Sequence, residues 1–327
     1  MAARSRRAAL AAAGAAWLVA ATPSLALPRG AGEGTDGEAP QPAAAASAAT
    51  APAPTPGSTL PAGRGGPGRG GQEPAPDRFA EALARGDRAF AGRADEGLLR
   101  EAIRAYGDAA AERPGDPRAE LPLARAWMLL ALAAPAETPG ACDAAARAAE
   151  RALRAQDPAF AAAVDGGEPP EKALAAVKAP GAEALYWLSY ASLEAARARG
   201  FAAVLAVRDA VLAGLGRAVA LDETVDHAGP RRVLGDLLAG LPSAVGGGAA
   251  KARAHFERAL ALAPDYQLTR VREAERLAVL LQDRALFDRL LAEVSGSEPG
   301  RAPAVAPENA LSRRLAAALR KRADRLF

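Results

Sequence analysis

The 327-residue sequence predicts an all-α fold, built as an array of repeated helix pairs. Two observations lead to this prediction. From Asp77 to the end, apolar residues recur with the period of a helix, and the short alternating β-branched runs that are typical of strands are absent. In addition, four residue types recur at one spacing in two distant segments, which are Ala102, Tyr106, Ala109 and Pro114, and Ala252, Phe256, Ala259 and Pro264.

This recurrence has a physical reason in helix packing. The two alanines let a partner helix approach closely, the aromatic side chain fills the remaining gap, and the proline ends the helix. The pattern is typical of the second helix of a tetratricopeptide unit. Such units stack into arrays that present a binding surface, so the sequence favours a binding protein over an enzyme.

The first 26 residues predict a secretory signal peptide. Arg4, Arg6 and Arg7 form a positive start, residues 8–21 form an apolar core, and Ser24-Leu25-Ala26 is a small-residue cleavage site. The apolar run is shorter than the roughly 20 residues that span a bilayer. The general secretory route is favoured, with the twin-arginine route, an uncleaved anchor and a cytosolic start as alternatives. No cysteine stands directly after the predicted cleavage site, so we expect a periplasmic protein without a lipid anchor.

Residues 27–76 consist mainly of Pro, Gly, Ala, Ser and Thr, which predicts a disordered linker because such a segment buries little apolar surface. The helical-repeat domain is expected at 77–327. Removal of the signal peptide reduces the 41 basic residues to 38, which equals the number of acidic residues. This neutral balance argues against nucleic-acid binding, which needs clustered positive charge.

Within 77–327, prolines, glycines and aspartates mark where the helices begin and end. The expected helices cover, in order, 96–113, a helix around Leu123, Ala124 and Trp127, 143–156, a short helix after Pro169-Pro170, 182–199, 201–221, 230–239, 249–262, 267–281, 284–294 and 307–326.

Few residues point to chemistry. His227 lies in an expected turn and His255 on a helix flank, and neither has a second His or Cys at metal-ligand spacing. Gly246-Gly247-Gly248 precedes Lys251 without the rest of a phosphate-loop signature, so it predicts a flexible turn. Cys142 is the only cysteine, which excludes an internal disulfide, and we expect it to be a small buried residue. We therefore expect no catalytic residue, no metal and no cofactor.

The aromatic residues offer one candidate site. Only 4% of the chain is aromatic, yet Tyr186, Trp187 and Tyr190 lie within five residues. Either they fill a core that alanine leaves underfilled, or they form the wall of a groove for an apolar or carboxylate ligand. In the second interpretation Tyr266 and Arg270 contribute from a later helix, with Phe287 and Arg272 as further candidates.

A series of motifs in the last third of the chain carries a family resemblance. They are Pro242 with Gly246-Gly247, Lys251-Ala252, Phe256-Glu257-Arg258-Ala259, Gln282-Asp283, Phe287 with Leu290 and Leu291, and Asn309 with Phe327, to which Leu185–Trp187 adds an earlier segment. In order and spacing they resemble the T-component family (TatT) of tripartite ATP-independent periplasmic (TRAP) transporters, over about 96–327.

The resemblance implies an exported accessory of a solute uptake system. Such a protein would bind the periplasmic solute receptor and an organic-acid or apolar ligand, and the family offers no catalytic residues to transfer. The alternative is a general periplasmic scaffold for envelope protein assembly that uses the same helices. The sequence leaves a homo-oligomer open.

Overall fold

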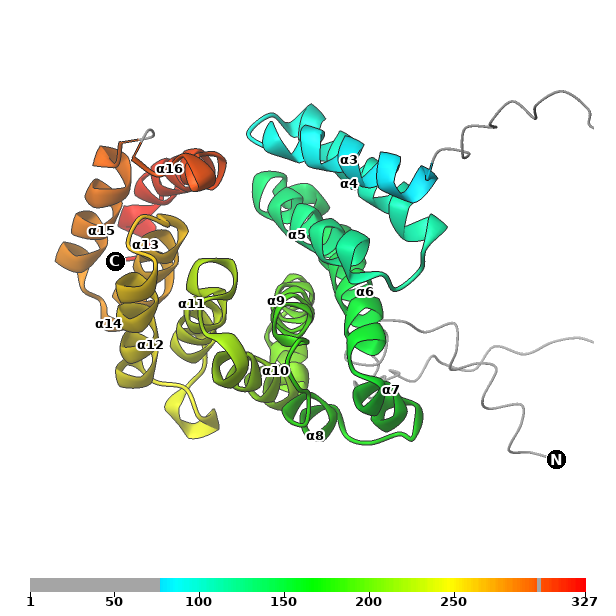
Figure 1. Ribbon diagram of the computed structural model, residues 1–327. Helices are drawn as coiled ribbons and strands as arrows, with labels where there is room; N and C mark the ends of the chain where they lie inside the picture. The colour runs from blue at the N-terminus through cyan, green and yellow to red at the C-terminus, as the bar shows by residue number, and fades with distance from the viewer. Residues whose placement is uncertain (1–76, 299–300) are drawn as a thin grey trace, which may run out of the picture. The chain divides into compact units, whose positions relative to one another are not determined.

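The computed structural model describes residues 77–298 and 301–327. Within these ranges the protein is all-helical and has no strand, which confirms the predicted fold class (Figure 1). The predicted signal peptide and linker, at 1–26 and 27–76, lie outside the described residues. The helices are α3 (Arg78–Ala91), α4 (Glu96–Glu112), α5 (Pro117–Ala133), α6 (Thr138–Gln156), α7 (Pro158–Asp165), α8 (Pro170–Ala175), α9 (Ala182–Arg199), α10 (Phe201–Asp222), α11 (Val225–Gly240), α12 (Ala249–Leu262), α13 (Leu268–Glu273), α14 (Val279–Leu281), α15 (Arg284–Gly296) and α16 (Ala306–Arg320).

Aspartate side chains explain where several of these helices begin. The first amide groups of a helix have no partner within it, and an aspartate just before the helix accepts hydrogen bonds from them. The aspartates that cap α3, α4, α5, α7 and α15 in this way are Asp77, Asp95, Asp116, Asp157 and Asp283.

The two recurring segments occupy equivalent places in two helix pairs. Tyr106 of α4 packs on Gly86 of α3, where an added Cβ atom would lie 2.5 Å from the ring. Phe256 of α12 packs in the same way on Gly235 of α11, at 3.0 Å. Both rings are buried, because the glycine lets the aromatic side chain reach the backbone of the preceding helix.

The small residues and prolines of these segments lie around the same contacts. The four alanines have no exposed surface, and each proline follows the end of its helix. The residues are Ala102, Ala109 and Pro114 for α4, and Ala252, Ala259 and Pro264 for α12.

Some helix boundaries differ from those expected. The segment 267–281 is not one α-helix, because a π-helical turn at Ala274–Ala278 separates α13 from α14. The last helix ends at Arg320 rather than at 326, and a 3₁₀ turn, Ala323–Arg325, follows it. The helix α7 was not expected after Asp157-Pro158, although proline is well tolerated at the first position of a helix.

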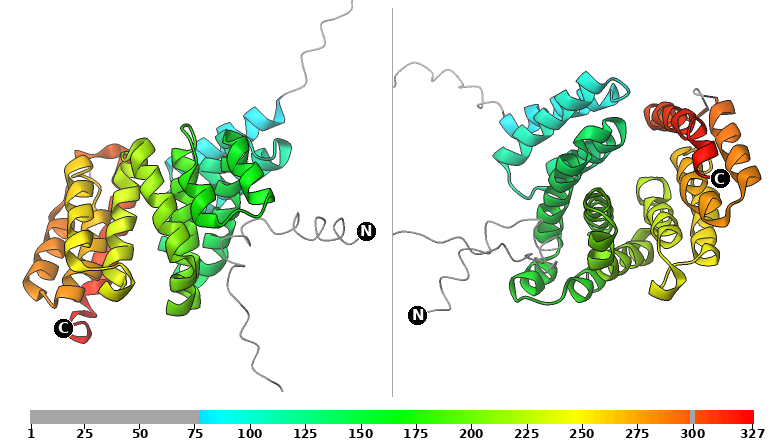
Figure 2. Two further views of the ribbon diagram at one scale, coloured as in Figure 1. Left: turned by 90° about the horizontal axis from the view of Figure 1, so that it is seen from below. Right: turned by 180° about the vertical axis from the view of Figure 1, so that it is seen from behind.

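Most neighbouring helices of the row are consecutive in the sequence, but α6 packs against α9, and the short α8 packs against α10 (Figures 1 and 2). A large core joins α3 to α11 and includes Leu311 of α16, and a second core joins α13, α15 and α16. The row curves until α16 meets the beginning of the array, where Glu308 of α16 accepts hydrogen bonds from Arg93 and Arg125. The candidate site lies on the inner side of this curve.

Candidate functional site

The three aromatic residues of α9 lie together in the core. Tyr186, Trp187 and Tyr190 are all at least 97% buried. The ring centroids of Tyr186 and Trp187 are 4.6 Å apart, and those of Tyr186 and Tyr190 are 5.8 Å apart. Nearly the whole circumference of α9 is buried between its neighbours, which fixes these rings in place.

The backbone opposite Tyr186 has an unusual conformation at the beginning of α11. Asp226, His227 and Ala228 have φ angles of 46°, 57° and 60°, in the left-handed region that L-residues rarely adopt. The next residue, Gly229, lets the Tyr186 ring approach closely, since an added Cβ atom would lie 2.4 Å from it. Three such residues in a row are unfavourable alone, so the surrounding contacts must hold them.

Arg232 supplies most of these contacts. It is 1% exposed, and its guanidinium donates hydrogen bonds to the Asp226 carboxylate at 2.8 Å and to the Tyr186 hydroxyl at 3.1 Å. It also donates to the backbone carbonyls of Asp226 and His227. The Tyr186 hydroxyl in turn donates to Asp226 at 2.8 Å. One buried arginine thus pairs with a carboxylate and holds the left-handed turn.

Tyr266 covers this network from the segment before α13. The Arg232 guanidinium lies 4.6 Å from the centre of the Tyr266 ring, a cation–π contact. The His227 ring stacks on the same Tyr266 ring at 4.8 Å and 14°. Burial lowers the pKa of His227 below its usual value, which favours the neutral ring in this stack.

The ionisation of the other groups follows from burial. Burial raises the pKa of Tyr190 to about 12 and raises the pKa values of Tyr186 and Tyr266 as well. Burial opposes the charge of Arg232, but the nearby oxygens of Tyr186, Tyr266 and Asp226 raise its pKa. The site therefore holds neutral phenols around a charged arginine.

These side chains border a narrow cleft with a free volume of about 20 Å³, close to the space that one water molecule needs. Its walls combine apolar, aromatic and charged side chains: Met128, Leu129, Leu132 and Leu268, then Trp187, Tyr190 and Tyr266, then Arg125, Asp226, Arg232 and Glu308. This composition suits a ligand with both an apolar and a polar part.

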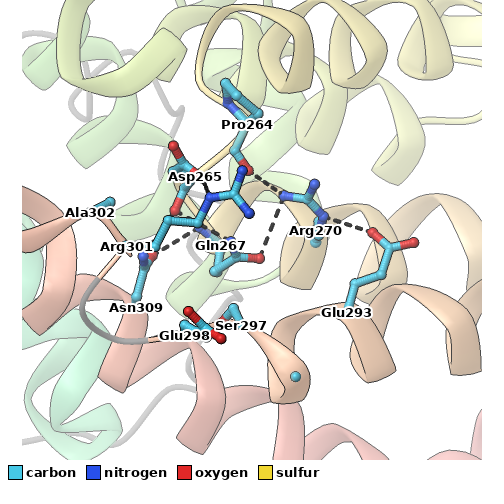
Figure 3. A pocket seen from close by; sticks show the side chains of 11 residues that line it. Pro264, Asp265, Gln267, Arg270, Glu293, Ser297, Glu298, Arg301, Ala302 and Asn309 are labelled. Carbon is cyan, nitrogen blue, oxygen red and sulfur yellow. Dashed lines mark hydrogen bonds and ion pairs between the residues drawn. The ribbon is translucent and has the colours of Figure 1, made fainter.

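The structure brings together four of the five ligand-site candidates. Trp187, Tyr190 and Tyr266 line the cleft, and Tyr186 lies behind them, bonded to Arg232. Arg270 lies elsewhere: it lines a separate polar groove of about 470 Å³ (Figure 3). There it donates hydrogen bonds to Glu293 at 2.8 Å and to the Pro264 carbonyl at 2.7 Å. It makes no hydrogen bond to the aromatic cluster among the described residues.

Sequence reasoning missed the charged residues of the cleft. Arg232, Asp226, Arg125 and Glu308 belong to no motif, and arginine is so frequent in this chain that one more attracts no notice. The one available signal was Asp226-His227 before Gly229-Pro230, which marks an interruption between helices.

The other residues that the sequence analysis singled out have local contacts that explain them without a binding site. Cys142 is fully buried, and burial raises the pKa of its thiol to about 12. Lys251 donates a hydrogen bond to the carbonyl of Gly246 and so stabilises the glycine turn that precedes its own helix, α12. His255 is half-buried, and burial lowers its pKa. Over 77–298 and 301–327, no group of three or more His, Cys, Asp or Glu side chains is arranged to hold a metal ion.

Two more candidates also lie outside the cleft. Phe287 packs edge-on against Phe327 in the C-terminal core. Arg272 pairs with Glu275 and is not among the residues that line the cleft.

The family model for the TRAP transporter T-component matches residues 142–327, which is more than half of the chain. The chain belongs to the TRAP transporter T-component family. This confirms the resemblance seen in the sequence, although the match begins at 142 rather than near 96. No curated protein matches the sequence.

The match covers α9, α11 and α16, while Arg125 and the rest of α5 lie before it. A TRAP T-component is an accessory of a transport system rather than a member of an enzyme family. In the part of the T-component that the structure describes, no helix has both the length and the apolarity that crossing a membrane requires.

Proposed function

We propose that this T-component acts in the periplasm as an accessory of a TRAP uptake system. In this proposal it binds the solute receptor of that system, and the cleft takes an organic-acid or apolar ligand. The signal-peptide pattern of residues 1–26 supports export.

The observation that carries the ligand proposal is the composition of the cleft. Leu129 and Leu132 of α5 face Trp187 and Tyr190 of α9, and Arg232 provides a charge that burial and hydrogen bonding hold in one place. Apolar walls with a few fixed polar groups are typical of small-molecule sites. Curved arrays of helix pairs commonly bind protein partners on their surface, which supports the receptor contact.

The ligand proposal is tested by filling the cleft. Leu129→Trp places a larger side chain in the cleft, whereas Leu98→Trp changes a leucine that is 40% exposed on α4 and serves as the matched control. Both variants and the parent chain are purified from the periplasm, and bound small molecules are identified by mass spectrometry. We expect the parent and Leu98→Trp to carry the same compound and Leu129→Trp to lose it. Equal loading of all three contradicts the cleft as the site.

The receptor contact is tested separately by co-purification with a solute receptor encoded beside the gene for this chain. Genes for such a receptor and for a membrane permease in that position favour the transport role. Binding to envelope proteins without any receptor favours the alternative, a periplasmic scaffold. Substitution of Trp187 by Ala distinguishes the two interpretations of the aromatic cluster: loss of ligand with intact helicity supports a pocket, and loss of folding supports a core role.

A further inference from the structure

The last long helix meets the beginning of the array through Leu311, which belongs to the large core, and through one carboxylate that carries most of the polar contacts there. Glu308 of α16 is 4% exposed and accepts two hydrogen bonds from Arg93, each at 2.9 Å, and one from Arg125 at 3.2 Å. Arg93 lies in the turn after α3, and it also donates to the carbonyl of Ala304 at 2.8 Å. A single glutamate therefore connects elements that are about 200 residues apart in the sequence.

The apolar packing beside this ionic contact is incomplete. Three cavities have walls from both α5 and α16, with volumes of about 20, 70 and 100 Å³, although α16 adds only Glu308 to the first and α5 adds only Leu132 to the third. Leu129 of α5 lines the first two, and Leu132 of α5 lines the first and the third. Leu132 and Leu315 are only partly buried, and they contact the C-terminal core at its border with the large core. Apolar side chains therefore leave gaps at the contact between α5 and α16, which we call the seam.

The cleft beside this seam is too small for a solute in the state described. Its volume of about 20 Å³ compares with the roughly 300 Å³ or more of typical ligand sites. Entry of a ligand thus requires one wall to move. The walls from α9 and α11 are held together by the buried network of Arg232, Asp226 and Tyr186, and α5 packs within the large core. The wall from α16 packs mainly in the C-terminal core, and toward α3 and α5 it is held by Leu311 and by the hydrogen bonds of Glu308.

We propose that α16, with the preceding 3₁₀ turn Pro303–Val305, is the gate of the cleft, and that Glu308 is the clasp that holds it closed. This inference rests on the proposed function, since it names how the same site is opened. When Glu308 separates from its partners, the guanidinium groups of two arginines become more exposed to water. The side chain of Arg125 is already 31% exposed, and that of Arg93 is 10% exposed. The charged groups therefore regain hydration as the gate opens, which makes the clasp reversible.

The motion can be measured with spin labels on the two sides of the seam. Arg104 of α4 and Arg320 of α16 are exposed, and each is replaced by Cys and labelled. Cys142 is buried and stays unlabelled in the folded chain. We expect Glu308→Gln to broaden the label-to-label distance distribution toward longer values, with unchanged helicity by circular dichroism. Glu308→Asp, which keeps the charge, should restore most of the narrow distribution.

The matched control is Glu293→Gln. Glu293 belongs to α15, pairs with Arg270 of α13 and lies away from the seam. A distribution in Glu308→Gln that equals that of the parent overturns the proposal. If Glu308→Gln loses helicity, Arg93→Gln replaces it, since Arg125 still holds Glu308 there. Broadening in Arg93→Gln then supports the gate, and a parent-like distribution overturns it.

A second measurement links the motion to the cleft. With Trp17 and Trp127 replaced by Phe, Trp187 becomes the only tryptophan, and it is 3% exposed in the closed state. We expect acrylamide to quench its fluorescence several-fold more strongly in Glu308→Gln than in the parent or in Glu293→Gln. Broadened distances without increased quenching contradict a gate over this cleft. Neither measurement uses receptor or solute, so a negative result here leaves the proposed function standing, and a failure to bind receptor leaves the gate standing.

Discussion

The cleft and the polar groove of Figure 3 both contain paired charges, but they differ in contact with water. In the cleft, Arg232 and Asp226 have side chains that are 2% and 7% exposed, and a tyrosine hydroxyl bonds to both. In the groove, Arg301 and Asp265 are 77% and 49% exposed and lie 3.4 Å apart.

Because of this difference in exposure, the two ion pairs contribute differently to the stability and geometry of the fold. An exposed ion pair adds little stability, because water competes for both partners. A buried pair adds little net stability either, but removal of one partner leaves the other charge without water or a counter-charge. The pair in the cleft therefore specifies one local geometry, which includes the left-handed residues 226–228.

The largest expected effect comes from breaking the buried pair. Arg232→Met leaves Asp226 buried without its main partner, so we expect the free energy of unfolding to fall by about 3–5 kcal/mol. Arg301→Met in the groove should lower it by less than about 1 kcal/mol. Urea denaturation followed by circular dichroism measures both. Equal losses of unfolding free energy in the two variants would mean that burial does not make one ion pair more important to the fold than the other.

The second prediction concerns high pH. Burial raises the pKa of all four tyrosines in the folded state, and for Tyr190 to about 12. The unfolded chain releases its phenolic protons near pH 10. The stability that these buried tyrosines contribute is therefore fully present below that pH and is lost as the pH rises above it. For Tyr190 alone the loss approaches about 3 kcal/mol by pH 12.

This is checked by tyrosinate absorbance during an alkaline titration. We expect little tyrosinate signal until the helical signal is lost, and then a joint transition. A gradual rise in absorbance in a fully helical protein would contradict the burial of these rings.

A smaller effect is expected when the hydroxyl alone is removed. Tyr186→Phe deletes the donor to Asp226 and the acceptor for Arg232 but keeps the ring, so we expect a loss of about 1–3 kcal/mol. The matched change is Tyr106→Phe, whose hydroxyl bonds to Asp87 near the surface. A Tyr186→Phe variant as stable as its parent would show that the network does not depend on this hydroxyl.

The smallest effect tests the left-handed turn itself. Ala228 has a φ of 60°, which glycine adopts at no steric cost, so Ala228→Gly should leave stability unchanged or raise it by up to about 1 kcal/mol. Ala206→Gly, at an exposed position within α10, should lower it by about 1 kcal/mol. Thermal unfolding of the two variants gives the comparison, and a loss at Ala228 as large as that at Ala206 argues against strain in this turn.

Much of the helix arrangement was predictable, because the signals for it are local. The expected helices at 182–199 and 249–262 agree with α9 and α12, and the segments at 96–113 and 201–221 differ from α4 and α10 by one residue at one end. One error fell where the chain departs from regular α geometry without proline or glycine, at the π-helical turn Ala274–Ala278. Others fell where proline begins a helix instead of ending one, as in α7.

The candidate site was only half predictable. The concentration of aromatic residues on α9 is visible in the sequence, but Tyr266 and Arg270, four residues apart, turn out to line different cavities. The turn between α12 and α13 decides this, since it directs Tyr266 toward Arg232 and Arg270 toward Glu293.

The sequence by itself determined the all-α class, the spacing of the two packing segments and the family, because periodicity, capping and motif order are properties of short stretches of chain. Only the tertiary structure decided which charges meet. Tyr186 and Arg232 are 46 residues apart, and Arg93 and Glu308 are 215 apart. Their contact depends on the accumulated angle between successive helix pairs, and no local pattern encodes that angle.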